Sequence, residues 1–125
     1  MTLREIIDKV NAFKSHSVST DILAGWLNEL DATLKNELFD VYEPGVTPEI
    51  KPYKAGEDLD RELLVPYPYC ELYVYYLLQQ IYSFTDETTQ YNNFSELYNT
   101  LLYTFKTYYI RNHSRGGSKF TNIWG

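Results

Sequence analysis

Few residues of this chain have side chains that could act as a nucleophile or a transition-metal ligand. The 125-residue sequence contains one cysteine, Cys70, and two histidines, His16 and His113, which stand near opposite ends. Cys70 paired with either histidine could make a nucleophile, but it lies in the apolar run PYPYCELYVYY, and a thiol buried in such surroundings is inert. The sequence has no zinc-type spacing, no glycine-flanked serine and no glycine-rich phosphate loop. We therefore predict no catalytic residue and no enzymatic activity.

The acidic segment GEDLDRE, residues 56–62, is the one stretch that resembles a metal site. A calcium loop needs a turn glycine and a bidentate acid at fixed later offsets, and the continuation DLDRELLVP supplies neither. The segment is therefore interpreted as a solvated acidic surface, and we expect no metal and no cofactor.

Charge is divided unevenly along the chain. Residues 1–105 hold all 17 acids and 7 bases, a net charge of −10, whereas residues 106–125 hold four bases and no acid, a net charge of +4. The acidic part argues against a general nucleic-acid binder. The basic end could meet phosphate or an acidic protein surface, and four charges do not choose between them.

The sequence also indicates where the protein is made. The N-terminal MTLREIIDKV mixes acids and bases and lacks the apolar stretch of a signal peptide. The longest apolar run, residues 72–78, is far shorter than the roughly 20 residues that cross a bilayer. A single cysteine cannot form an internal disulfide, so we expect one domain made in a reducing cytoplasm, with no membrane contact.

Two helices are predicted before residue 42. Thr2 and Glu5 have the spacing of a capping box, so the first helix should cover residues 3–14. Ser19 is the candidate N-cap of a second helix over residues 19–41. Its apolar side chains recur every three or four residues and include three predicted core residues, Trp26, Leu30 and Leu34.

Two further residues of the second helix support specific expectations. Asp31 and Lys35 have i,i+4 spacing and are expected as an ion pair on the outer side. Gly25 lies inside the helix at a cost of about 1 kcal/mol relative to alanine, which predicts close approach by a neighbouring backbone.

The rest of the chain predicts a long loop and two more helices, and hence a small all-α bundle of four main helices. Residues 42–65 contain three prolines and two glycines and should form a loop, with at most a short strand, that either binds something or is mobile. The third helix is expected over residues 68–84 and the fourth over 86–111. Their predicted core residues are Leu72, Tyr73, Leu101 and Phe105.

The third helix is apolar on two faces, which allows two interpretations. Such a helix is either central to its own core or wedged between its own chain and another. Ordinary core and boundary tyrosines would explain the pattern, whereas a second chain would explain why so many tyrosines stand there. The candidate subunit-interface residues are Tyr69, Tyr75, Leu78 and Tyr82.

The C-terminal segment differs in composition from the helices. We divide the chain into a helical domain, residues 1–111, and a flexible tail, residues 112–125, in which Gly116 and Gly117 form a joint. The cations and the apolar side chains at this end are suited to binding a pocket, on this chain or on a partner. The docking candidates are Arg111, Arg115, Lys119, Phe120, Ile123 and Trp124.

Three stretches of the sequence, taken in order, resemble the small head-tail connector (adaptor or head-completion) proteins of tailed bacteriophages and prophages. They are WLNELDATLKNELFD, then DLDRELLVPYPYCELYVYYLLQQI after a proline-broken loop, and finally YNNFSELYNTLLYTFKTYYIR. The resemblance covers roughly residues 3–111, and its most specific part is the acidic-leucine-valine-proline approach to the tyrosine-bearing helix. The tail is less typical. The residues that match are Trp26, Leu30, Leu63, Leu64, Pro66, Tyr69, Leu72, Tyr73, Tyr91, Asn92 and Tyr109.

The resemblance implies a structural role in the virion. In that family about a dozen helical subunits form a ring beneath the portal, extend the DNA channel and present a platform to the next neck component. The implied partners are other copies of this chain, the portal protein, the next neck or tail component, and DNA only as passing content of the channel. The matching residues would serve as scaffold and subunit contacts, the tail would dock on the portal, and the protein, made in the host bacterial cytoplasm, would reside at the head-tail joint.

Two alternatives stay open at the level of sequence. A cytosolic helical regulator or antitoxin-like protein would use the same apolar surfaces to bind a single partner. Another neck protein, a stopper or a tail terminator, is the second alternative, although those families are usually richer in strands.

Overall fold

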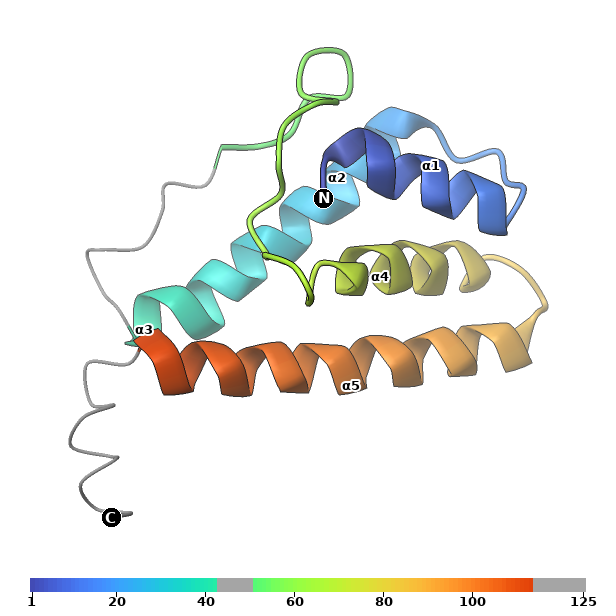
Figure 1. Ribbon diagram of the computed structural model, residues 1–125. Coiled ribbons are helices and arrows are strands. Elements are labelled where there is room, and N and C mark those ends of the chain that lie inside the picture. Colours follow the sequence, from blue (N-terminus) through green and yellow to red (C-terminus); the bar gives the residue numbers. More distant parts are fainter. Residues whose placement is uncertain (43–50, 114–125) are drawn as a thin grey trace.

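The structure is a computed structural model that describes residues 1–42 and 51–113. Within these residues it confirms the predicted all-α bundle of four main helices and contains no β-strand (Figure 1). Helices α4 (Glu71–Tyr82) and α5 (Thr88–His113) form an antiparallel hairpin, and α1 (Leu3–Phe13) lies on the other side of α4. Helix α2 (Thr20–Leu34) crosses behind and also contacts α4. Helix α4 is therefore the centre of the bundle.

Helix α1 begins at the predicted capping box. The Thr2 hydroxyl accepts a hydrogen bond from the Glu5 N–H at 3.2 Å, and the Glu5 carboxylate accepts one from the Thr2 N–H at 3.2 Å. The next free N–H of the first turn, that of Arg4, donates to the Leu59 carbonyl at 2.8 Å. The described part of the predicted loop forms no strand, and its one strand-like pairing is an isolated antiparallel bridge between Thr2 and Glu62. The start of α1 is thus bound to the segment that precedes α4.

Helix α2 begins at Ser19, whose hydroxyl accepts from the Ile22 N–H at 3.3 Å. It continues without interruption through the π-helical turn η1 (Lys35–Phe39) into the short α3 (Asp40–Tyr42). In η1 the Asp40 N–H donates to the Lys35 carbonyl, and the Lys35 ammonium pairs with the Asp40 carboxylate at 2.8 Å. A π-turn brings residues five apart onto the same side, so the side-chain pair and the backbone bond agree.

Two expectations for this helix are wrong. Asp31 is only 1% exposed and does not pair with Lys35 on the outer side, because it faces the core beside Leu27 and Leu34. No atom outside the helix backbone lies within 4 Å of the place where a side chain on Gly25 would begin, so no neighbour requires a glycine there.

The last two helices begin later than predicted. Residues 67–70 form turns with a cis peptide before Pro68, and the Leu72 and Tyr73 N–H groups bond three residues back instead of four, so α4 starts at Glu71. Helix α5 starts at Thr88 and continues to His113, so Asn112 and His113 belong to the helix and not to the tail.

The hydrophobic core lies where α1, α2 and α5 meet α4. Five predicted core residues, Leu30, Leu34, Leu72, Tyr73 and Phe105, are buried. Trp26 and Leu101 are half-buried and pack against the edge of the core. Leu78 and Tyr82 are 1% and 4% exposed, which corrects their assignment as subunit contacts. They face inward because α4 is covered by three helices of its own chain.

Candidate interaction surfaces

A buried carboxylate, missed at the level of sequence, fixes the segment that leads to α4. The Asp31 carboxylate accepts hydrogen bonds from the Tyr53 hydroxyl at 2.5 Å and from the Tyr73 hydroxyl at 2.7 Å. These hydroxyls in turn accept from the backbone N–H groups of Leu64 at 3.3 Å and Val65 at 3.0 Å. We call Asp31, Tyr53 and Tyr73 the carboxylate clasp.

Charge and burial keep the protons of the carboxylate clasp in place. Burial raises the pKa of the Asp31 carboxyl, while the hydrogen bonds from the two tyrosines oppose that shift. Burial, together with the neighbouring carboxylate, raises the pKa of Tyr53 and of Tyr73, so both phenols stay protonated and donate to Asp31. The Arg61 guanidinium lies 4.2 Å from the centroid of the Tyr53 ring, and its positive charge also acts on the Asp31 carboxyl. These hydrogen bonds join α2 to α4 and to the segment that precedes α4.

Asn28, one turn before Asp31 in α2, makes two more hydrogen bonds to Tyr53. Its side-chain amide donates to the Tyr53 carbonyl at 3.1 Å, and its side-chain oxygen accepts from the Tyr53 N–H at 2.6 Å. Residues 51–65, the described part of the predicted loop, are thereby held against α2 and α1. Tyr69 lies four residues after this segment, and its ring contacts the rings of Phe105 and Tyr108 on α5.

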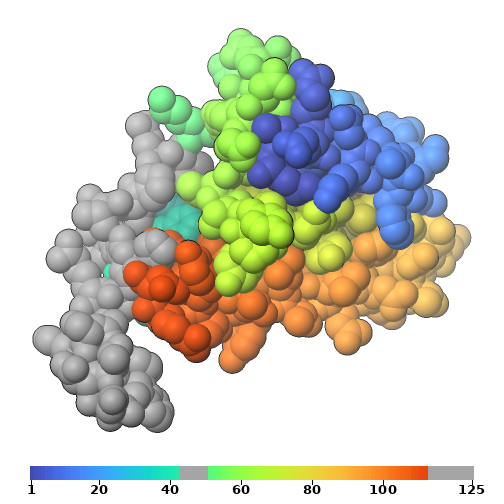
Figure 2. All heavy atoms as spheres, viewed as in Figure 1, coloured from blue at the N-terminus to red at the C-terminus, as the bar shows by residue number. Residues whose placement is uncertain are grey.

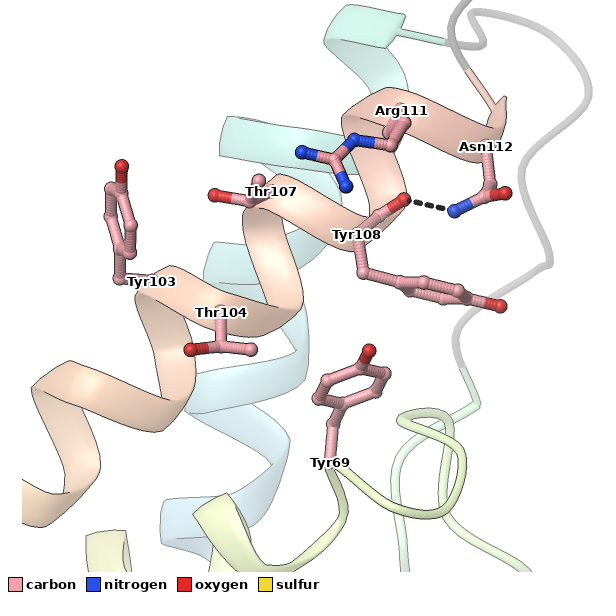
Figure 3. Close-up of a pocket in the computed structure, with 7 residues that line it drawn as sticks. All are labelled: Tyr69, Tyr103, Thr104, Thr107, Tyr108, Arg111 and Asn112. Carbon is pink, nitrogen blue, oxygen red and sulfur yellow. Dashed lines mark hydrogen bonds between the residues drawn. The ribbon is translucent and has the colours of Figure 1, made fainter.

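The first exposed surface is a groove at the carboxyl end of α5. Its seven lining residues enclose about 250 Å³, and in Figure 3 the ring of Tyr69 points toward that of Tyr108, at 5.0 Å between centroids. Tyr103 stands 73% exposed one turn earlier on the same helix. Figure 2 shows the segment before α4 lying against this end of α5. The Tyr69 groove, as we name it, consists of Tyr69, Tyr103, Thr104, Thr107, Tyr108, Arg111 and Asn112.

Arg111 gives the Tyr69 groove its charge. Among the described residues it is the only charged one that lines the groove, and it makes no ion pair with any of them. The Asn112 amide is engaged by the Tyr108 carbonyl at 2.8 Å, whereas the guanidinium is exposed. A guanidinium beside aromatic rings suits a ligand that carries both a carboxylate and an apolar or aromatic group.

The second exposed surface lies around the turn from α4 to α5. The Phe84 ring, 73% exposed, stacks on the half-buried Trp26 ring with centroids 6.0 Å apart. Ile22 is half-exposed one turn before Trp26 on α2. Two exposed acids, Glu29 on the same side of α2 and Asp86 beside Phe84, flank these side chains. Together these five residues are the Phe84 patch.

The sequence around the Phe84 patch lacks positive charge. Residues 15–34 and 62–105 contain no lysine or arginine. The cations that border the first of these ranges, Lys14 and Lys35, each pair with an acid, Glu87 at 2.8 Å and Asp40 at 2.8 Å. The Phe84 patch is thus an apolar surface with acidic surroundings, opposite in charge to the Tyr69 groove.

A third depression, of about 450 Å³, lies between α1 and the turn at residues 55–59. Arg4 and Asp8 line it with opposite charges, together with two polar residues, Asn11 and Thr20, and with Ile7, Ala55, Gly56 and Leu59. Within residues 1–42 and 51–113 no group of three or more His, Cys, Asp or Glu side chains could hold a metal ion. In the same ranges no helix is long and apolar enough to cross a membrane.

The structure separates the sequence-predicted site residues. Arg111 and Tyr69 meet in the Tyr69 groove, whereas Tyr75 is half-buried with its ring 6.3 Å from that of Phe94. Cys70 is buried, and the His16 ring is engaged locally by the Asn11 side chain at 2.6 Å. The remaining docking candidates, Arg115, Lys119, Phe120, Ile123 and Trp124, lie outside the described residues.

Comparison of the chain with models of known families, with curated proteins and with solved structures finds no match. The resemblance to head-tail connectors therefore stays a prediction from the sequence.

Proposed function

We propose that this protein is a structural subunit of a tailed-bacteriophage head-tail joint, a connector that forms a ring beneath the portal and joins head to tail. The observation that carries the proposal is the pair of exposed aromatic surfaces, the Tyr69 groove and the Phe84 patch. A subunit within a ring must contact two neighbours through two different surfaces. The sequence resemblance supplies the particular assembly.

Charge supports the same proposal. The net charge of the chain is −6, and its acids are concentrated before residue 106. A wall of that sign repels the phosphates of DNA, so a channel built from such subunits would let DNA pass without gripping it. In this proposal DNA is the content of the channel, and the ligands of the protein are other proteins, namely its own copies, the portal and the next neck component.

The chemistry of the described residues favours a structural role over a catalytic one. Cys70 is buried in the core, and His16 is held by Asn11 at the end of α1. Asp31, the one buried carboxylate among the described residues, accepts one hydrogen bond on each oxygen from two tyrosine hydroxyls that stay protonated. Each of these groups holds the fold together, which is the role we assign to them.

The proposal is tested by negative-stain microscopy of the purified protein, alone and mixed with the portal protein encoded nearest to its gene. We expect rings that attach to the portal vertex. Attachment to tail tubes instead would assign the protein to another neck role, such as a tail terminator. The proposal would be refuted if the protein did not bind the portal and its gene lay away from portal, capsid and tail genes. That result would favour a cytosolic regulator.

A further inference from the structure

The two exposed aromatic surfaces lie at opposite ends of one long helix. Phe84 precedes the first residue of α5 by four positions, and Arg111 stands two residues before its end. A helix of 26 residues spans roughly 39 Å. Figure 1 shows α5 running the full length of the bundle, with the turn from α4 at one end and the carboxyl end of α5 at the other. The Tyr69 groove and the Phe84 patch of one chain therefore cannot meet each other.

The two surfaces carry opposite charges. The Tyr69 groove has the cation Arg111, which pairs with no acid among residues 1–42 and 51–113. The Phe84 patch has the exposed acids Glu29 and Asp86 in a part of the sequence without lysine or arginine. Contact between like ends of two copies would bring like charges together, whereas contact between unlike ends would pair a guanidinium with carboxylates.

The two surfaces also match in chemistry and size. The Tyr69 groove is open to solvent and has a volume of about 250 Å³, and a cavity of about 150 Å³ is enough to hold benzene. Phe84 lies on Trp26 at the turn between α4 and α5 with 73% of its surface exposed. A phenyl ring that enters the groove would lie against the paired rings of Tyr69 and Tyr108, where offset or edge-to-face contacts are favoured.

From this geometry we propose that the occupant of the Tyr69 groove is the Phe84 patch of a second copy of this chain. Phe84 enters the groove, and Arg111 pairs with the carboxylates of Asp86 and Glu29. The contact is heterologous, since each copy offers one end and receives the other, so repetition leads to a closed ring or an open filament. Closure into a ring rests on the proposed connector function, whereas the end-to-end contact does not.

The test uses two variants of the full chain, each with one surface altered. The groove variant carries Tyr103→Ser and Arg111→Glu, and the patch variant carries Phe84→Ser and Asp86→Lys. All four residues are exposed, so we expect both variants to fold, which thermal melting checks. A matched control, Glu96→Lys with Leu97→Ser, changes an exposed acid and an exposed apolar residue in the middle of α5.

Sedimentation at low ionic strength and high protein concentration measures the outcome. We expect the wild type and the control to self-associate, and each altered surface to raise the dissociation constant about thirtyfold or more. Added salt should weaken the association. An equimolar mixture of the two variants should form dimers and nothing larger, because one intact groove and one intact patch remain. A wild type that stays monomeric, or a mixture no more associated than either variant alone, would overturn the proposal.

The same samples distinguish this inference from the connector function. Self-association of the expected pattern without attachment to a portal would leave the end-to-end contact standing and refute the connector role. Portal-bound rings that form equally well from both variants would support the connector role and refute the end-to-end contact.

Discussion

The buried carboxylate of Asp31 is the residue on which the most specific part of the fold depends. Its oxygens accept from Tyr53 on the returning segment and from Tyr73 on α4, so one side chain of α2 joins three parts of the chain. A buried polar group costs free energy when it loses its partner, and here each hydroxyl also accepts a backbone N–H. Removing one hydroxyl would therefore leave two groups without a partner.

Our first prediction concerns these hydroxyls. Tyr53→Phe and Tyr73→Phe should each lower the free energy of unfolding by about 1–3 kcal/mol. Each change leaves one Asp31 oxygen and one backbone N–H buried in the core without a hydrogen-bond partner. Tyr67→Phe is the matched control, because Tyr67 is 86% exposed. Urea denaturation measures all three. Equal stability of the Tyr53→Phe variant and the control would show that the carboxylate clasp adds nothing to the fold.

The second prediction concerns pH. Burial raises the pKa of Asp31, so the folded chain holds this proton more tightly than the unfolded chain. The stability from this group is complete below the ordinary aspartate pKa of about 3.9 and is lost as pH rises toward the raised value of the folded chain. The wild type should therefore lose stability relative to Asp31→Asn across that pH interval. Above it, the free energies of unfolding of the two proteins should change in parallel with pH.

Other carboxylates do not obscure the comparison. Hydrogen bonds from Thr2 lower the pKa of Glu5, and the Lys14 ammonium lowers that of Glu87, so their contributions change with pH in the opposite direction. Both groups are present in the wild type and in Asp31→Asn, and their effects cancel in the difference. Urea denaturation at a series of pH values gives the two curves, and parallel curves throughout would contradict the raised pKa.

At the scale of elements, α4 and α2 differ in how completely they are covered. Helix α4 is apolar nearly all round because three helices of its own chain surround it. The first half of α2 instead has Trp26 at its open edge, where the indole stacks on the exposed Phe84. Trp26 is thus a boundary residue, although its type and spacing predict a core anchor.

The third prediction follows from that position. Trp26→Ala should cost about 1–2 kcal/mol, from the aromatic pair with Phe84 and the part of the indole that packs against the core. Leu27→Ala, its buried neighbour, should cost about 2–5 kcal/mol. Thermal melting of the two variants compares them directly. A loss at Trp26 as large as that at Leu27 would place the indole in the core and weaken the assignment of the Phe84 patch as a free surface.

At the scale of the whole molecule, residues 1–42 and 51–113 contain a contiguous hydrophobic core with aromatic surfaces at both ends. We therefore expect a chain that ends at His113 to keep a nearly normal melting temperature. Under the proposed connector function it should lose co-purification with the portal, because the docking candidates after Arg111 are removed. A destabilised chain that still binds the portal would show that the C-terminal segment is structural and that docking lies elsewhere, most plainly in residues 42–65.

The four main helices could be predicted from the sequence alone. Caps and periodicity act locally, so the capping box at Thr2, the N-cap at Ser19 and the apolar stripe of α2 could be read without knowing any neighbour. Burial of Cys70 followed in the same way from its apolar surroundings. The later starts of α4 and α5 arise from turn geometry that propensity does not specify.

Which helix faces are covered could not be predicted in this way, because it depends on the tertiary fold. Asp31 stands in a heptad pattern with Ala24, Leu27, Leu34 and Leu38, which indicates burial, although a charged residue is normally expected at the surface. The tyrosines that donate hydrogen bonds to it lie 22 and 42 residues away in the sequence. Leu78 and Tyr82 could have faced another chain until α1 and α5 were seen to enclose α4. A local pattern reports that a face is apolar, but what covers it depends on contacts between segments far apart in the sequence, and these exist only in the folded chain.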